Sequence, residues 1–209
     1  KPFFSIVLTT SNHRPYTFPE GRVDAPQKKW SSAVKYTDWA IADFLQKAKT
    51  KPWFKDTIFV ISADHCAGSA GKTAVPVARY HIPLLIYAPQ HIKPQHIQQI
   101  VSQIDVPPTI LGLLNMDYIS RFIGRDILRT PPEQQRALIA TYQRLALYKN
   151  DDLVILSPQK HVEIHRQPLT EDKILAASAN PDLVQETISY YQGADYALRH
   201  GLLKAVKQK

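Results

Sequence analysis

An acid and an imidazole stand side by side at Asp64-His65, directly after an apolar run. That run, residues 58–61, is β-branched and aromatic without polar alternation, so we predict a strand that is covered on both faces. Side chains just beyond the carboxyl end of a buried parallel strand lie where α/β sheets place their sites. There, both groups can turn toward one ion, and an aspartate with a neutral histidine suits Zn²⁺ or Mn²⁺ better than Ca²⁺. The alternative is that Asp64 caps the next loop and His65 is simply exposed.

A second histidine, His13, follows another apolar segment, residues 3–10, which we also predict to be a buried strand. A helix expected over residues 28–49 would connect it to a strand at 57–62. If the two strands are parallel and the crossover is right-handed, both loops open on the same edge of the sheet. We therefore expect His13 to converge with the Asp64-His65 pair; otherwise it is a solvated loop histidine.

Other reactive side chains cluster near the acid–imidazole pair in the sequence. Lys72 and Arg79 lie in a glycine-containing segment, residues 67–79, and could hold an anionic group. The alternative is that, as lone basic residues in a basic protein, they are ordinary surface charges. His81 precedes a strand and could face the site or be packed. Cys66 adjoins an imidazole, but sequence neighbours are poorly placed to act as nucleophile and base, so we do not favour a thiol nucleophile.

The rest of the chain predicts further helices and strands in alternation. Thr130, Pro131 and Glu133 form a helix start, with a cap, a first-turn proline and an acid that reaches back to the cap. We predict a strand at 82–89, short helices at 94–101 and 107–115, a helix from 130 to about 148, a hairpin of 153–156 with 161–165, and a helix from Asn180-Pro181 to about 198. The expected fold is α/β, a mostly parallel sheet flanked by helices over residues 1–149, with a small α+β subdomain, a hairpin plus a helix, over 150–209.

Composition limits the partners of the chain. Its 209 residues suffice for one domain and a small annex, and its formal charge of +8 favours anionic partners. No Lys/Arg run has the length of a nucleic-acid-binding tail, so we expect no nucleic-acid partner. The single cysteine excludes an internal disulfide, and no apolar run is long enough to span a membrane. Because the chain opens on residues typical of a central strand, we expect it to be the C-terminal piece of a longer protein.

Six segments, in their order and spacing, resemble the C-terminal half of the catalytic domain in one branch of the sulfatase/alkaline phosphatase superfamily. This is the lipoteichoic acid synthase-like, or phosphoglycerol transferase, branch. The segments are TTSNHRPY, YTDWAIADFL, DTIFVISADHC, RYHIPLLIYAP, QIDVPPTILGLL and FIGRDIL. They cover most of residues 1–130.

The resemblance implies an enzyme that is anchored in a bacterial membrane, with an extracytoplasmic catalytic domain. Such proteins move a phosphoglycerol or related group from an anionic phospholipid headgroup through a covalent phospho-threonine. Asp64 and His65 align with two ligands of one divalent metal ion, commonly Mn²⁺ and in some relatives Zn²⁺ or Mg²⁺, and His13 aligns with a histidine beside the substrate phosphate. The family's threonine and an acidic ligand lie upstream, so the chain would need the upstream half of its protein and would be inactive alone. Cys66 stands where the family often has Gly or Tyr, which leaves the subfamily open.

Two other functions remain open from the sequence. The same fold serves sulfatases, phosphodiesterases and phosphoethanolamine transferases, which act on other phosphate or sulfate esters. A function of a different class is a non-catalytic module that binds an anion or a partner.

Overall fold

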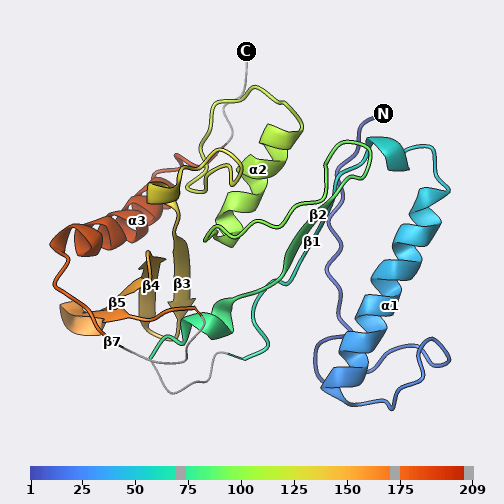
Figure 1. Ribbon diagram of the computed structural model, residues 1–209, viewed down its shortest axis with the longest axis horizontal. Helices are drawn as coiled ribbons and strands as arrows, with labels where there is room; N and C mark the ends of the chain where they lie inside the picture. Colours follow the sequence, from blue (N-terminus) through green and yellow to red (C-terminus); the bar gives the residue numbers. More distant parts are fainter. Residues whose placement is uncertain (69–73, 170–174, 205–209) are drawn as a thin grey trace. The chain divides into compact units, whose positions relative to one another are not determined.

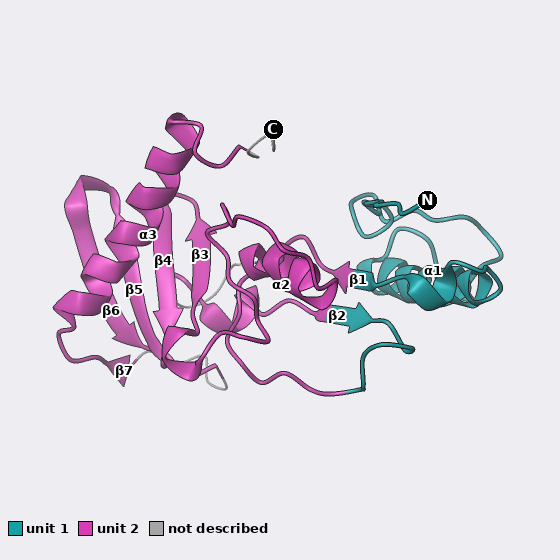
Figure 2. Ribbon diagram, turned by 90° about the horizontal axis from the view of Figure 1, so that it is seen from above, with its two compact units in different colours: residues 1–60, 85–94 teal, residues 61–84, 95–209 magenta. Residues whose placement is uncertain are grey.

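The computed structural model describes residues 1–68, 74–169 and 175–204. These residues divide into two compact units, residues 1–60 with 85–94 and residues 61–84 with 95–209, coloured separately in Figure 2. In the described ranges, no helix combines the length and the apolarity needed to cross a bilayer.

The first unit is organised around helix α1, Trp30–Lys49, which confirms the helix predicted at 28–49. Lys47 and Lys49 in its last turn complement the negative end of the helix dipole. Phe18 stacks on Tyr36 of this helix with ring centroids 5.2 Å apart, and Phe44 contacts Phe59 edge to face. Aromatic packing on one side of α1 therefore holds this unit together.

The strand predicted at residues 3–10 is wrong for the described structure. This segment has no regular secondary structure, and its apolar side chains are exposed, with Phe4 82% and Val7 80% accessible. A strand needs a neighbouring strand for its backbone N–H and C=O groups, and among the described residues no strand pairs with this segment. Apolar composition alone therefore did not predict this segment, because it does not supply the pairing partner that a strand needs.

Strands β1, Phe59–Ser62, and β2, Leu84–Tyr87, pair in a two-stranded sheet and confirm two of the predicted strands. Just beyond them, the backbone N–H of Ala63 donates to the carbonyl oxygen of Pro83 at 3.4 Å. The chain thus enters the Asp64-His65 loop from the end of a strand, as the sequence predicted.

The second unit contains a five-stranded antiparallel sheet in the order β3-β4-β5-β6-β7. The strands are Ala137–Thr141, Arg144–Lys149, Asp152–Ser157, His161–Arg166 and Leu175–Ala176. Strands β5 and β6 confirm the predicted hairpin. This five-stranded sheet is antiparallel throughout, whereas the sequence predicted a mostly parallel sheet over residues 1–149.

The helix predicted from residue 130 to about 148 is wrong. Only the three-residue turn η4, Pro132–Gln134, is helical, and the rest forms the β3–β4 hairpin. Its two-residue loop, Tyr142 and Gln143, has neither Gly nor Asn, although Gln143 adopts a positive φ of 55°. The usual hairpin signal is missing, and the Ala- and Leu-rich composition favours a helix locally, so cross-strand pairing and burial decide the outcome.

The sheet is covered on both faces by its own unit (Figure 1). Helix α3, Pro181–Arg199, packs Leu183 against Leu147 and Val154 on one face. On the other face, Val75 and Val77, the latter at the start of turn η2, Val77–Tyr80, pack among sheet residues. These sheet residues are Ile139, Ala146, Tyr148, Leu153 and Ile155.

Two predicted short helices have different outcomes. Helix α2, Val106–Leu113, confirms the helix expected at 107–115, and it follows the turn η3, Gln103–Asp105. The helix expected at 94–101 is wrong, because these residues have no helical structure and are largely exposed. The turn η5, Pro158–Lys160, connects β5 to β6.

The division into residues 1–149 and 150–209 does not coincide with the two units. Residue 150 lies in the tight turn between β4 and β5, whose strands pair directly. Asn150 and Asp151 both have positive φ there, at 53° and 65°, as the type I′ turn of a two-residue hairpin loop requires. The change in sequence character at residue 150 marks a turn inside one sheet.

Candidate metal-binding site

The side chains of Asp64 and His65 lie together in the loop after β1. The backbone N–H of His65 donates to Asp64 Oδ1 at 3.0 Å, which turns the carboxylate toward the imidazole. As a result His65 Nε2 lies 3.6 Å from Asp64 Oδ2. Neighbouring side chains point apart within a strand, so this approach depends on the strand having ended.

The tautomer of His65 follows from its second hydrogen bond. Its Nδ1 lies 2.7 Å from the carbonyl oxygen of Cys66. A carbonyl oxygen can only accept, so Nδ1 carries a proton and donates it, and in the neutral ring Nε2 therefore keeps a free lone pair. Metal-binding histidines in proteins are commonly oriented by such a bond from the other ring nitrogen.

The geometry of the pair fits part of a metal site. Zn–N and Zn–O bonds of about 2.0–2.2 Å at a tetrahedral angle place two donor atoms about 3.4 Å apart. The 3.6 Å between His65 Nε2 and Asp64 Oδ2 is close to this, and both side chains are mainly exposed, at 75% and 67%. Within the part of the chain that the structure describes, no group of three or more His, Cys, Asp or Glu side chains could hold a metal ion. The pair can therefore supply two ligands, and a complete site needs others.

Gln103 contacts this loop, and the sequence did not single it out. Its side-chain Nε2 donates to the carbonyl oxygens of Ala63 at 2.9 Å and of Asp64 at 2.8 Å. A glutamine 39 residues away has no ligand spacing and no reactive group, so only the fold reveals this contact.

His13 belongs to the other unit. Its Nδ1 lies 2.9 Å from the carbonyl oxygen of Arg14, so it also donates from Nδ1 and keeps Nε2 free. The ring is exposed, and the His13 backbone N–H donates to the carbonyl oxygen of Thr10. The convergence of His13 with Asp64 and His65, which lie in different units, stays a prediction.

Arg79 and His81 are not joined to the pair in the described part of the chain. Arg79 lies in η2 and is exposed, and His81 follows it and is also exposed. Among the described residues, no hydrogen bond or ion pair connects Arg79 or His81 to Asp64 or His65. Lys72 lies outside the described residues. The roles predicted for these three in anion binding stay predictions.

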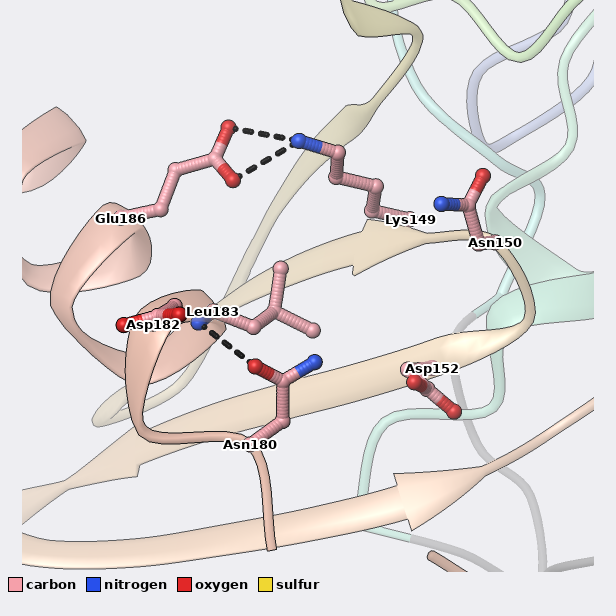
Figure 3. A pocket seen from close by; sticks show the side chains of 7 residues that line it. All are labelled: Lys149, Asn150, Asp152, Asn180, Asp182, Leu183 and Glu186. Atoms are coloured by element: carbon pink, nitrogen blue, oxygen red, sulfur yellow. Dashed lines mark hydrogen bonds and ion pairs between the residues drawn. The ribbon is translucent and has the colours of Figure 1, made fainter. Parts of the chain in front are cut away.

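A separate cavity of about 200 Å³ lies between the β4–β5 turn and the start of α3 (Figure 3). Three of its polar side chains are engaged in bonds. Lys149 Nζ binds both carboxylate oxygens of Glu186, at 3.1 and 2.8 Å, and Asn180 Oδ1 accepts the backbone N–H of Leu183 at 3.0 Å. Because the ion pair and the cap use these groups, the cavity is a less suitable site for chemistry than the Asp64-His65 loop.

The chain is similar to a set of known proteins. The sulfatase family model matches residues 1–116. Lipoteichoic acid synthase 2 of Bacillus subtilis is 28% identical over 151 residues, which is 61% of this chain and 23% of that protein. Phosphoglycerol transferase I of Escherichia coli is 41% identical over 62 residues, 30% of this chain and 8% of that protein.

One solved structure is similar over nearly the whole chain. It is a protein in the alkaline phosphatase superfamily from Vibrio parahaemolyticus, with a TM-score of 0.91 and 34% identity over 99% of this chain and 51% of that chain. This chain thus spans about half of the solved structure and 23% of the lipoteichoic acid synthase. The superfamily resemblance and the α/β class predicted from the sequence are confirmed.

Proposed function

This chain belongs to the sulfatase family, and from that premise we propose that its protein is a metal-dependent phosphoryl-group transferase that acts on phospholipid headgroups. The names of two relatives, a lipoteichoic acid synthase and a phosphoglycerol transferase, support a phosphoglycerol-type reaction. In this proposal the protein acts on the outer side of a bacterial membrane to which it is anchored.

One observation supports Asp64 and His65 as the residues that hold the metal ion in this proposal. His65 is held by its Nδ1–H bond to the Cys66 carbonyl, and its free Nε2 faces Asp64 Oδ2 at 3.6 Å. Both residues lie in the range that the family model matches, residues 1–116. A divalent cation, Mn²⁺ in the first place and Zn²⁺ or Mg²⁺ otherwise, would be held by this oxygen and this nitrogen.

The residues of the chain then have distinct roles. A bound divalent ion neutralises charge on phosphoryl oxygens and lowers the pKa of a hydroxyl nucleophile. With its Nδ1–H donated to the Arg14 carbonyl, His13 would have to take up a second proton at Nε2, and from there it would hydrogen-bond a phosphoryl oxygen or protonate the departing alkoxide. The covalent threonine and the remaining metal ligand would come from residues outside this chain. Without them, we expect the 209-residue chain alone to be inactive.

The substrate would be anionic. The chain has a formal charge of +8, which raises the local concentration of anionic headgroups near its surface. Lys72, Arg79 and His81 would be the contacts for the phosphate or its alcohol. Phosphoryl transfer depends mainly on such positioning and electrostatic support.

The test compares substrates in the full protein that contains this chain. Purified protein with Mn²⁺ is given radiolabelled phosphatidylglycerol, phosphatidylethanolamine or an aryl sulfate, and products are separated by chromatography. We expect diacylglycerol and transferred glycerol phosphate from phosphatidylglycerol, and loss of both in a His65→Ala variant. Release of sulfate alone would overturn the proposal in favour of a sulfatase. Failure to turn over any of the three would favour a non-catalytic binding module.

A further inference from the structure

Gln103 holds the backbone on both sides of Asp64. The two N–H bonds of its side-chain amide can donate at once, and the carbonyl oxygens of Ala63 and Asp64 lie 2.9 and 2.8 Å from its Nε2. These two carbonyls belong to the peptide groups that flank the Asp64 Cα. Fixing both peptide planes fixes the direction in which the Asp64 side chain leaves the backbone.

The backbone of Gln103 is itself held in place by a capping box. Gln103 begins the turn η3, in which the backbone N–H of Ser102 donates to Asp105 Oδ2 at 2.8 Å. Ser102 Oγ in turn accepts the backbone N–H of Leu138 in strand β3 at 3.2 Å. The turn is therefore tied to the antiparallel sheet of the same unit.

A buried ion pair anchors the other end of the turn. Arg136 donates from Nη1 to Asp105 Oδ2 at 2.7 Å and from Nη2 to Asp105 Oδ1 at 2.9 Å. Their side chains are only 1% and 3% exposed, and Asp105 Oδ1 also accepts the backbone N–H of Arg125 at 2.8 Å. A bidentate pair without access to water permits little movement, so the turn presents Gln103 in one place.

We infer that Gln103 is a positioning residue for the Asp64-His65 pair and that the buried Asp105–Arg136 ion pair fixes its location. The inference rests on the proposed role of Asp64 and His65 as metal ligands. It adds that the ligand loop is held from a segment about 40 residues away, through two carbonyl oxygens that do not themselves bind the metal. Gln103 touches neither substrate nor ion in this role.

If Gln103 served only to stabilise the fold, its replacement would destabilise the protein as a whole; a positioning role predicts otherwise. Gln103 is exposed, so its two bonds act on the loop and not on the core. Replacing it should leave the global unfolding transition unchanged and alter only the order of the loop and its affinity for the ion. Asp105 and Arg136 are unsuitable for substitution here, since removing one partner of a buried pair leaves an uncompensated charge and strongly destabilises the whole fold.

The experiment uses the full protein and three variants at this position. Gln103→Met and Gln103→Glu keep the length of the side chain but remove its donors, whereas Gln103→Lys restores a donor of sufficient reach. The exposed Gln98 provides the matched control, Gln98→Met. Hydrogen exchange of the peptide that covers residues 60–68 is measured without metal, and the dissociation constant of Mn²⁺ is measured by calorimetry.

We expect loop exchange at least about 10-fold faster in Gln103→Met and Gln103→Glu, with Mn²⁺ binding weakened about 10- to 100-fold. The turnover number should fall at low Mn²⁺ and recover at saturating Mn²⁺, with the KM for lipid unchanged. Gln103→Lys should partly reverse both the faster loop exchange and the weaker Mn²⁺ binding, and Gln98→Met should behave as the wild type. Unchanged exchange in Gln103→Met, or faster exchange with unchanged Mn²⁺ affinity, would overturn the inference. Unchanged Mn²⁺ affinity in His65→Ala would instead refute the metal site itself, so the two failures are distinguishable.

Discussion

The chemistry of His65 is decided by which ring nitrogen carries the proton. Its Nδ1–H is donated to the main-chain carbonyl of Cys66, so the contact does not use the thiol at all. The same arrangement recurs at His13, where the acceptor is the carbonyl of the following residue, Arg14. In both cases Nε2 is the ring nitrogen left available: without a proton it can bind a cation, and with a proton it can donate to a phosphate oxygen.

At the scale of the residue, we predict that Asp64→Asn and His65→Ala each weaken Mn²⁺ binding by more than about 100-fold. Loss of a residue that only hydrogen-bonds a metal ligand costs about 10- to 100-fold, and loss of the ligand itself should cost more. Asn keeps the shape of the side chain but loses the charge, and Ala removes the nitrogen donor. Isothermal titration calorimetry of the full protein with Mn²⁺ measures this. The exposed His96 gives the control, His96→Ala, which should bind as the wild type does. Equal affinity in all four proteins would exclude Asp64 and His65 as ligands.

The element that encloses one face of the sheet, α3, begins with a cap that the sequence predicted. Asn180 Oδ1 accepts the backbone N–H of Leu183 at 3.0 Å, and Pro181 occupies the first helical position. We predict that Asn180→Ala lowers the free energy of unfolding by about 1 kcal/mol, since a donor of the first turn loses its acceptor. Urea denaturation measures the change. Asn180→Asp keeps the acceptor and should cost much less; a loss as large as that of Ala would show that the cap is not the cause.

A second prediction concerns how α3 is attached to the β3–β4 hairpin. The hydroxyl of Tyr191 lies 2.9 and 2.8 Å from the carbonyl oxygens of Ile139 and Ala146, and burial raises the pKa of Tyr191 to about 12. The unfolded chain loses this proton near pH 10 while the folded chain keeps it, so the stabilising contribution is complete below pH 10 and is lost as the pH rises to about 12. The free energy of unfolding should therefore fall over this interval. In Tyr191→Phe this fall should be shallower; an identical slope would contradict the assignment.

The elements near the candidate site were predictable, and several distant ones were not. The run at residues 58–61 and the residues after it contain both the strand and its polar end, so local sequence is sufficient there. The β3–β4 hairpin was missed because its loop lacks the usual turn residues, and the segment at 3–10 was missed because a strand depends on a partner. Gln103 was missed for a similar reason: its role arises only when η3 is folded onto the loop after β1.

At the scale of the whole molecule, the family is shown by residues 1–116, while the antiparallel sheet and α3 lie after them. The solved relative includes both regions, since it covers 99% of this chain at a TM-score of 0.91. In the Asp105–Arg136 ion pair, Asp105 lies near the end of the region that the family model matches, and Arg136 directly precedes β3. The C-terminal sheet is thus connected, through η3 and Gln103, to the loop that carries Asp64 and His65.

The most direct test measures the initial rate of glycerol phosphate transfer from phosphatidylglycerol as Mn²⁺ is added to metal-free full protein. For the wild type we predict no turnover without Mn²⁺ and a rate that rises to saturation. For His65→Ala we predict a curve displaced to higher Mn²⁺ by more than about 100-fold, or no turnover at all. Superimposable curves for the two proteins, or full turnover by the wild type without any divalent ion, would contradict the proposal that Asp64 and His65 bind a catalytic metal.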